Sequence, residues 1–137
     1  MYCAMTLCLL ECVLAAQTDA ADLQQSVQAL SATVRREGDV RIRVEAARSL
    51  GSLGLRARAS ASEGLSAALR DLAAPELIDA LDDFDYRVRS ASAAALGNLG
   101  TNATEAVPRL VEALGDQDST VRTAAVRALG GIGEEAL

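Results

Sequence analysis

Three Asp–Arg pairs with the same spacing contain the residues of this sequence that are best placed to do chemistry. In each pair the arginine follows the aspartate by four residues. The pairs are Asp39 with Arg43, Asp85 with Arg89, and Asp118 with Arg122. An Asp at a helix N-terminus is favourable against the helix dipole, and an Arg four residues later stands one turn above it. The pairs therefore predict a structural ladder rather than a catalytic site.

The composition removes the usual groups for catalysis. The chain of 137 residues contains no His, so neither a Ser-His-Asp nor a Cys-His arrangement can be assembled. Cys3, Cys8 and Cys12 match no CxxC zinc or redox spacing. We therefore expect no catalytic residue, no metal site and no cofactor, and we predict that the protein is not an enzyme.

The charge and the aromatic content argue against a nucleic-acid partner. The net charge is −6, whereas nucleic-acid binders normally present a basic surface. The aromatic residues are Tyr2, Phe84 and Tyr86, which are too few for stacking on bases.

The elements that position the Asp–Arg pairs belong to a repeated sequence. Its copies, Asp39–Gly54, Asp85–Gly100 and Asp118–Gly133, each contain Ile/Val-Arg, an alanine-rich turn and Leu-Gly-x-Leu/Ile-Gly. Self-similarity at this scale is typical of solenoids, in which each unit buries its apolar side against a neighbour. The predicted fold is all-α: a superhelical stack of antiparallel helix pairs.

Apolar spacing of three and four residues places these pairs at about residues 21–54, 73–100 and 104–133, within an array over 21–137. The repeated leucines Leu50, Leu96 and Leu129 are expected at matching buried positions. In the third pair, Leu110, Val111 and Leu114 are expected to face inward. The glycines of each Leu-Gly-x-Leu/Ile-Gly are expected to end the second helices.

Two segments interrupt the pattern. Residues 55–72 contain the thirteen residues by which the spacing between the first two repeats exceeds the spacing between the last two. This segment is either a linker or a specific loop. Ser60 or Ser62 could cap a short helix there, or one long helix could precede Pro75. Residues 134–137 begin a truncated fourth repeat, which favours a fragment of a longer array.

Residues 1–20 form a separate apolar segment. It is either a helix that caps the first repeat or a signal peptide over Met1–Ala16, although no basic residue precedes the apolar run and Glu11 interrupts it. The apolar run Met1–Ala16 is too short to span a membrane as a helix. A cytoplasmic location is favoured, with export if the segment is cleaved.

The repeated residues resemble HEAT repeats, specifically the short bacterial type associated with phycobilisome lyases. This resemblance implies that the second helices line the concave face, with the turn Asp and the helix Arg forming a ladder from repeat to repeat. It also implies a non-catalytic scaffold or adaptor that binds a protein or peptide. The alternative is a bilin lyase or chromophore-chaperone subunit, with arginines pairing with bilin propionates.

The second helices are richer in arginine than the acidic first helices and turns. If the second helices line the concave face, that face is mildly basic within an acidic shell. We therefore predict an acidic partner segment there, contacted by four arginines: Arg41, Arg48, Arg87 and Arg127.

Overall fold

The computed structural model describes residues 20–36, 38–60 and 62–136. Met1–Ala16, with its three cysteines, lies outside the described residues. The helices are α2 (Ala20–Arg36), α3 (Val40–Ser60), α4 (Glu63–Ala68), α5 (Ala74–Ala80), α6 (Tyr86–Leu99), α7 (Val107–Ala113) and α8 (Ser119–Ala136). A π-helical turn, η1 (Leu69–Ala73), joins α4 to α5, and a 3₁₀ segment, η2 (Gly100–Ala106), precedes α7. Within these ranges there is no strand.

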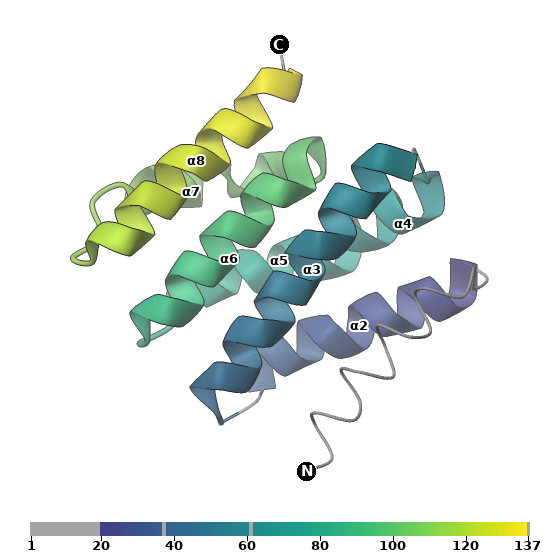
Figure 1. Ribbon diagram of the computed structural model, residues 1–137, viewed down its shortest axis with the longest axis horizontal. Coiled ribbons are helices and arrows are strands. Elements are labelled where there is room, and N and C mark those ends of the chain that lie inside the picture. The colour runs from purple at the N-terminus through teal and green to yellow at the C-terminus, as the bar shows by residue number, and fades with distance from the viewer. Residues whose placement is uncertain (1–19, 37, 61, 137) are drawn as a thin grey trace.

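The helices form two rows (Figure 1). The second helices α3, α6 and α8 lie side by side on the near side, and α2, α4, α5 and α7 lie behind them. Each second helix packs on the first helix of its own pair, and α6 also packs on the second helices on both sides, α3 and α8. The predicted all-α stack of helix pairs is confirmed.

The core lies between the two rows and follows the repeat. Leu50, Leu77, Leu96 and Leu110 are fully buried, and alanines fill the narrow spaces between helices. Fully burying a leucine side chain contributes about 1.5–3 kcal/mol. These repeated leucines therefore hold the two rows together.

The third pair departs from the predicted burial pattern. Val111 is 53% exposed and Leu114 is 38% exposed, and Leu129 is only partly buried. The prediction that Val111 and Leu114 face inward is wrong. Their equivalents in the second pair, Ile78 and Leu81, are covered partly or fully, whereas no further helix pair covers α7 and α8 among the described residues.

The predicted insertion is helical rather than a loop. α3 continues past Leu53 to Ser60, and a second helical stretch begins at Glu63 after the N-cap Ser62 and leads into α5. The extra residues between the first two repeats therefore lengthen α3 at its end and add the helical stretch that leads into α5.

The π-helical turn η1 accommodates a proline inside this helical stretch. Pro75 has no N–H to donate and its ring crowds the carbonyl one turn earlier. The Ala74 N–H instead reaches back five residues to the Leu69 carbonyl, which widens the helix just before the proline. The chain stays helical across Pro75 as a result.

Most glycines of the repeated sequence lie inside helices instead of ending them. Only Gly100 ends its helix, at a positive φ of 58°. Gly97 lies inside α6, where an added Cβ would stand 2.7 Å from the Cα of Ala128 in α8. At the equivalent place in α3, a Cβ on Gly51 would stand 3.1 Å from the Cα of Ala95. α3 continues past Gly51 and Gly54, and α8 continues past Gly130 and Gly133. The expectation that the repeated glycines end these two helices is therefore wrong.

We predict opposite effects for two glycine substitutions in this repeated position. Gly97→Ala should lower the free energy of unfolding by about 1–3 kcal/mol, because the new methyl group meets the α8 backbone. Gly130→Ala should raise it by about 0.5–1 kcal/mol, because an added Cβ at Gly130 has no neighbour within 4 Å. Urea unfolding of both variants measures the difference; equal effects would contradict the close contact of α6 and α8.

Ser92 gives a second stability prediction. Its side chain is fully buried, and its hydroxyl has no hydrogen-bond partner within the part of the chain that the structure describes. Ser92→Ala should raise the free energy of unfolding by about 1 kcal/mol, since a buried hydroxyl without a partner is costly. The control is Ser31→Ala, because the buried Ser31 hydroxyl donates to the Val27 carbonyl at 2.7 Å. Ser31→Ala should be less favourable, and a reversed order would contradict the unpaired state of Ser92.

Candidate interaction surface

The turns between helices are built by aspartates that cap the second helices. The Asp39 carboxylate accepts a hydrogen bond from the Arg41 N–H at 2.8 Å. Asp85 accepts from the Arg87 N–H at 2.9 Å. Such N-caps satisfy helix N–H groups that have no partner within the helix. Asp118 caps α8 in the same way through the Thr120 N–H at 2.8 Å.

A second aspartate stands two residues before the cap in the last two turns. The Asp83 carboxylate accepts the Asp85 N–H at 2.9 Å, and the Asp116 carboxylate accepts the Asp118 N–H at 2.9 Å. This arrangement fixes the turn, and both oxygens of each upstream carboxylate also face an arginine of the preceding pair.

Arg89 joins its own turn to the turn of the next pair. Its guanidinium donates to the backbone carbonyls of Asp83 at 2.9 Å and Phe84 at 3.2 Å. The same group forms a two-bond pair with Asp116, at 2.8 and 3.0 Å. Paired N–H donors of this kind match a carboxylate in both distance and angle.

Arg43 repeats this arrangement one pair earlier. It donates to the Gly38 carbonyl at 3.2 Å and pairs with the Asp83 carboxylate, with N–O distances of 3.1 and 3.2 Å. Its side chain is 6% exposed. The Phe84 ring lies over it, with its centroid 5.2 Å from the guanidinium carbon. Burial of the charge is therefore balanced by both a carboxylate and an aromatic face.

The ladder thus runs through different carboxylates from those that the sequence predicts. The expected acids, Asp39, Asp85 and Asp118, cap helices, and the inter-repeat partners are Asp83 and Asp116. Arg122 contacts only its own turn among the described residues, donating to the carbonyls of Asp116 and Gln117 at 2.8 and 3.0 Å. The arginine positions were predicted, and their partners were not.

The turn carboxylates are held in the ionised state. Hydrogen bonding from the Arg87 guanidinium lowers the pKa of Asp85 from 3.8 to about 2. The hydrogen bonds from Arg89 lower the pKa of Asp116, and the Thr120 hydroxyl lowers the pKa of Asp118. A lowered folded-state pKa means that the ion pair contributes stability above the ordinary value and loses it as the pH falls.

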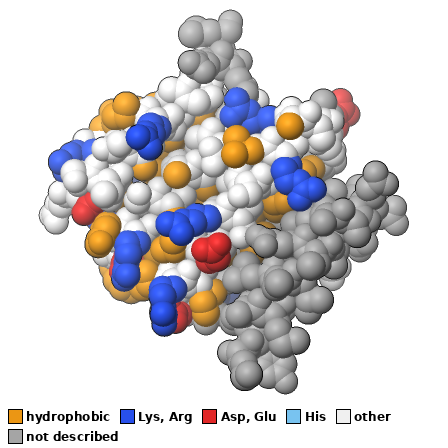
Figure 2. All heavy atoms as spheres, viewed as in Figure 1, with side chains coloured by type: hydrophobic (Ala, Val, Ile, Leu, Met, Phe, Trp, Pro, Cys, Tyr) orange, Lys and Arg blue, Asp and Glu red, His pale blue; other side chains and the backbone are white. Residues whose placement is uncertain are grey.

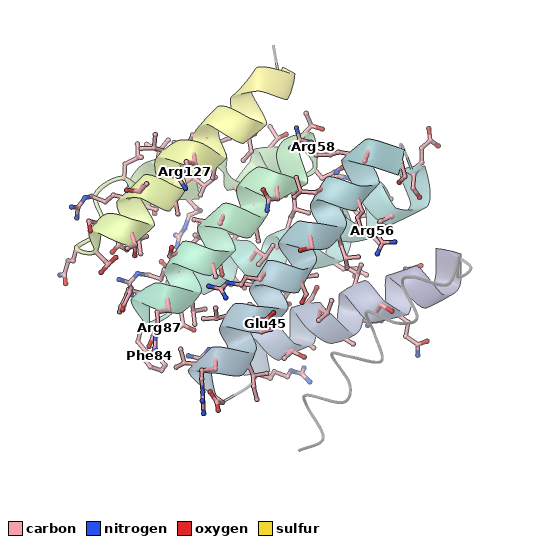
Figure 3. The ribbon with its side chains drawn as sticks, viewed as in Figure 1. Glu45, Arg56, Arg58, Phe84, Arg87 and Arg127 are labelled. Carbon is pink, nitrogen blue, oxygen red and sulfur yellow. The ribbon has the colours of Figure 1, made fainter. Side chains whose placement is uncertain are left out.

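Two of the four arginines predicted to contact a partner are paired within their own helix start. Arg87 forms two hydrogen bonds to Asp85, at 3.0 and 2.9 Å. Arg41 lies 3.8 Å from Asp39, with 88% of its side chain exposed. Figure 3 shows Arg87 beside Phe84 at the turn end of the second-helix row. A partner that pairs with these arginines would compete with their own capping aspartates.

The other two arginines lie apart from each other. Arg48 on α3 is close to Glu45, at 3.9 Å, and is exposed. Arg127 on α8 lines a groove between α6 and α8. The structure therefore does not bring the four arginines together, and only Arg127 faces a hollow in the surface.

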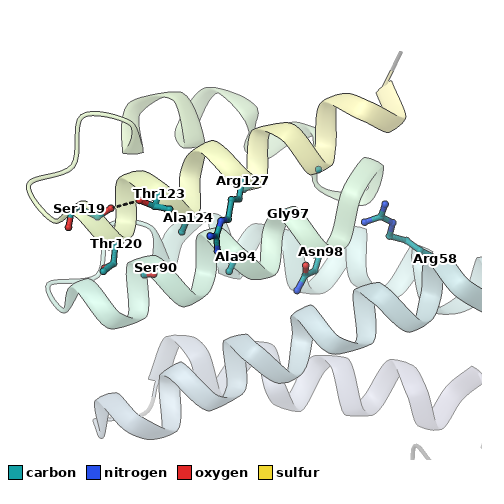
Figure 4. A pocket seen from close by; sticks show the side chains of 12 residues that line it. Arg58, Ser90, Ala94, Gly97, Asn98, Ser119, Thr120, Thr123, Ala124 and Arg127 are labelled. Atoms are coloured by element: carbon teal, nitrogen blue, oxygen red, sulfur yellow. Dashed lines mark hydrogen bonds between the residues drawn. The ribbon is translucent and has the colours of Figure 1, made fainter.

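This groove lies on the second-helix face, the surface formed by α3, α6 and α8 on the side away from α2, α5 and α7. Its volume is about 620 Å³. Figure 4 shows Arg127 pointing from α8 toward Ala94, with Asn98 further along α6 and Arg58 approaching from α3. Its wall is made of small residues and of side chains with hydroxyl or amide groups: Ser90, Ala94, Gly97, Asn98, Ser119, Thr120, Thr123, Ala124, Ala128 and Gly131.

Arg58 is the groove residue that sequence reasoning missed. It lies in the last turn of α3, beyond Gly54, in the segment that we expected to be an insertion. The fully buried Ala57 beside it continues the apolar spacing of Leu50 and Leu53. That continued spacing was the available signal that the helix extends past the glycines.

Known proteins support the repeat fold. Residues 74–137 match a family model described as HEAT repeats. The chain is also similar to the crystal structure of an engineered protein, with a TM-score of 0.61 and 21% sequence identity. That alignment covers 93% of this chain and 62% of the engineered protein, so the chain spans less than two thirds of its length. No curated protein matches the chain.

Together, the family match and the stacked helix pairs support a HEAT-type repeat protein. The finer resemblance to phycobilisome lyases is not confirmed. Within residues 20–36, 38–60 and 62–136, no cluster of His, Cys, Asp or Glu could hold a metal ion. None of the helices in these ranges has the length and apolar character needed to cross a bilayer.

The ladder predicts a pH-dependent effect of Asp116→Asn. The variant should lose about 1–3 kcal/mol of unfolding free energy at pH 7, because Arg89, 17% exposed, loses its carboxylate. The hydrogen bonds from Arg89 lower the pKa of Asp116 from its ordinary value of 3.8, so the difference from wild type should be complete above about pH 5 and shrink as the pH falls further.

Chemical unfolding at pH 7 and pH 3 measures this effect. The control is Asp82→Asn, since Asp82 pairs with Arg109 at the surface with 71% of its side chain exposed. It should change stability by less than about 1 kcal/mol. Equal losses of unfolding free energy for both variants would show that the inter-repeat ion pair stabilises the fold no more than a surface ion pair.

Proposed function

We propose that this protein is a non-catalytic interaction scaffold that binds a segment of another protein in the groove between α6 and α8. The observation that carries the proposal is the groove itself, which combines two arginines, Arg58 and Arg127, with a wall of small and hydroxyl-bearing residues. Small side chains allow the backbone of a bound segment to approach closely, and hydroxyl and amide groups can hydrogen-bond to it. HEAT-type folds support such a role, since stacked repeats create extended binding surfaces.

The charge of the groove favours an acidic segment. Its lining contains two arginines and no Asp or Glu. Figure 2 shows arginine side chains spread over this face of the molecule. Arginine forks match carboxylates in geometry and steer oppositely charged partners. The proposed partner therefore carries Asp or Glu side chains spaced to reach both ends of the groove.

The alternative function, a bilin lyase or chromophore chaperone, gains less from the same surface. The two arginines could pair with propionate groups. Ligand pockets for flat cofactors are mostly lined by hydrophobic and aromatic side chains, and none of the residues that line this groove is aromatic. The groove therefore favours a peptide over a tetrapyrrole.

Peptide binding with charge-reversed variants tests the proposal. The probe is a fluorescein-labelled ten-residue acidic peptide, compared with its Asn/Gln counterpart by fluorescence anisotropy. The acidic peptide should bind more tightly, and Arg58→Glu with Arg127→Glu should weaken binding by about tenfold or more and flatten its salt dependence.

The matched control has the same charge change outside the groove. Arg41→Glu with Arg48→Glu should leave the affinity within about threefold, since neither residue lines the groove. Equal weakening by both double variants would favour a diffuse charge effect over the groove. Tighter binding of the neutral peptide would contradict an acidic partner.

A further inference from the structure

The internal repeat allows one surface to be compared in three copies. On α3 and α6, the side that faces the next pair is covered by α6 and α8 respectively. On α8, the same side is exposed. Val126 is 60% exposed, whereas its equivalents Ala47 and Ala93 are fully buried. Gly130, which corresponds to Gly51 and Gly97, has no neighbour near its Cβ position.

The neighbouring first helix extends the same exposed surface. Val111 and Leu114 on α7 are both exposed, at 53% and 38%. Together with Val126 and the partly buried Leu129, they make an apolar patch that we call the outer α7–α8 face. Exposed apolar side chains gathered on two helices that pack on each other indicate an interaction site.

Arg122 supplies the polar part of this face. Arg43 and Arg89 each bind the carbonyls of their own turn and the carboxylate of the following turn. Arg122 likewise binds the carbonyls of its own turn, but no carboxylate within the described ranges pairs with it. Its side chain is exposed, so its remaining N–H groups are accessible to a partner.

We propose that the outer α7–α8 face is a docking surface for a further helix pair of the same repeat type. The partner's turn would place an aspartate, two residues before its helix N-cap, on Arg122, as Asp83 is placed on Arg43. The partner's second helix would need a small residue opposite Gly130. This requirement follows because Gly51 and Gly97 face Ala95 and Ala128 at nearly backbone distance.

A second copy of this chain fits the surface poorly. The opposite outer face, on α3, carries the exposed Glu45 where α6 and α8 have the buried Ala91 and Ala124. Packing Glu45 against Val126 would remove the charges of Glu45 and its neighbour Arg48 from water and place the carboxylate against an apolar side chain, which is costly. The contact positions therefore favour a partner pair with alanine at this position.

An added repeat unit tests the proposal directly. A second copy of residues 101–133 is inserted after Gly133 of the full chain, so that a new Asp116 equivalent follows Arg122 in register. We expect the melting temperature to rise by about 5 °C or more. Backbone amides of α8 should also become more slowly exchanging with solvent deuterium. Unchanged exchange in α8 would overturn the proposal, whatever the helix content of the added unit.

A double-mutant cycle tests the aspartate. Arg122→Gln and the Asn substitution of the added aspartate should be coupled by about fivefold or more in the unfolding equilibrium constant. Arg127→Gln, on the groove side of α8, is the matched control and should show no coupling. Absence of coupling with Arg122 would overturn the assigned partner chemistry.

Sedimentation of the unaltered chain tests the competing occupant. If the outer α7–α8 face is built for a different helix pair, the unaltered chain should sediment as a monomer. A dimer that Val126→Asp dissociates would identify a second copy as the occupant and overturn the proposal.

Discussion

The arginine that reaches from one helix pair to the turn of the next is the contact on which the array depends. Arg89 is held by two backbone carbonyls of its own turn and by both oxygens of Asp116. These bonds fix the distance between the pairs and the angle at which one turn meets the other. Hydrophobic packing alone is non-directional and would set neither so narrowly. The leucine core makes the stack stable, and the arginine sets its geometry.

Close backbone contact at the glycines completes this constraint. Gly97 allows α8 to approach α6 until an added methyl group would overlap Ala128. The turn end of each second helix is thus fixed by an ion pair and its middle by a glycine contact. A helix held at two points cannot rotate about its axis without breaking one of them. The side chains of the second-helix face are consequently presented in a defined arrangement, on which any binding surface there relies.

The sequence predicts the elements whose signals are local. The ends of α6 follow from local signals, because Asp85 caps its start and Gly100 ends it at a positive φ. The extensions of α3 and α8 are not found, because a glycine inside a helix reads the same in the sequence as a glycine that ends one. In α3, Gly51 and Gly54 are explained by the close approach of α6, a neighbour that only the fold supplies.

The same limit applies to the sites. The four-residue spacing of Asp85 and Arg89 points to a local pair, yet the carboxylate that Arg89 holds is 27 residues away. Arg127 was predicted as a contact from its helix alone, and it does line the groove. Arg58 was missed because its helix was expected to have ended. Long-range contacts of this kind depend on how the pairs stack, which periodicity does not specify.

The extended α3 has a consequence for any bound segment. A perfectly uniform array offers the same footprint at every step, so a ligand could slide along it by one unit without losing contacts. Here the added turns of α3 carry Arg58 to one end of the groove, and α6, with 14 residues against the 21 of α3, has no counterpart. A segment that needs both Arg58 and Arg127 has one place and one direction in which to lie.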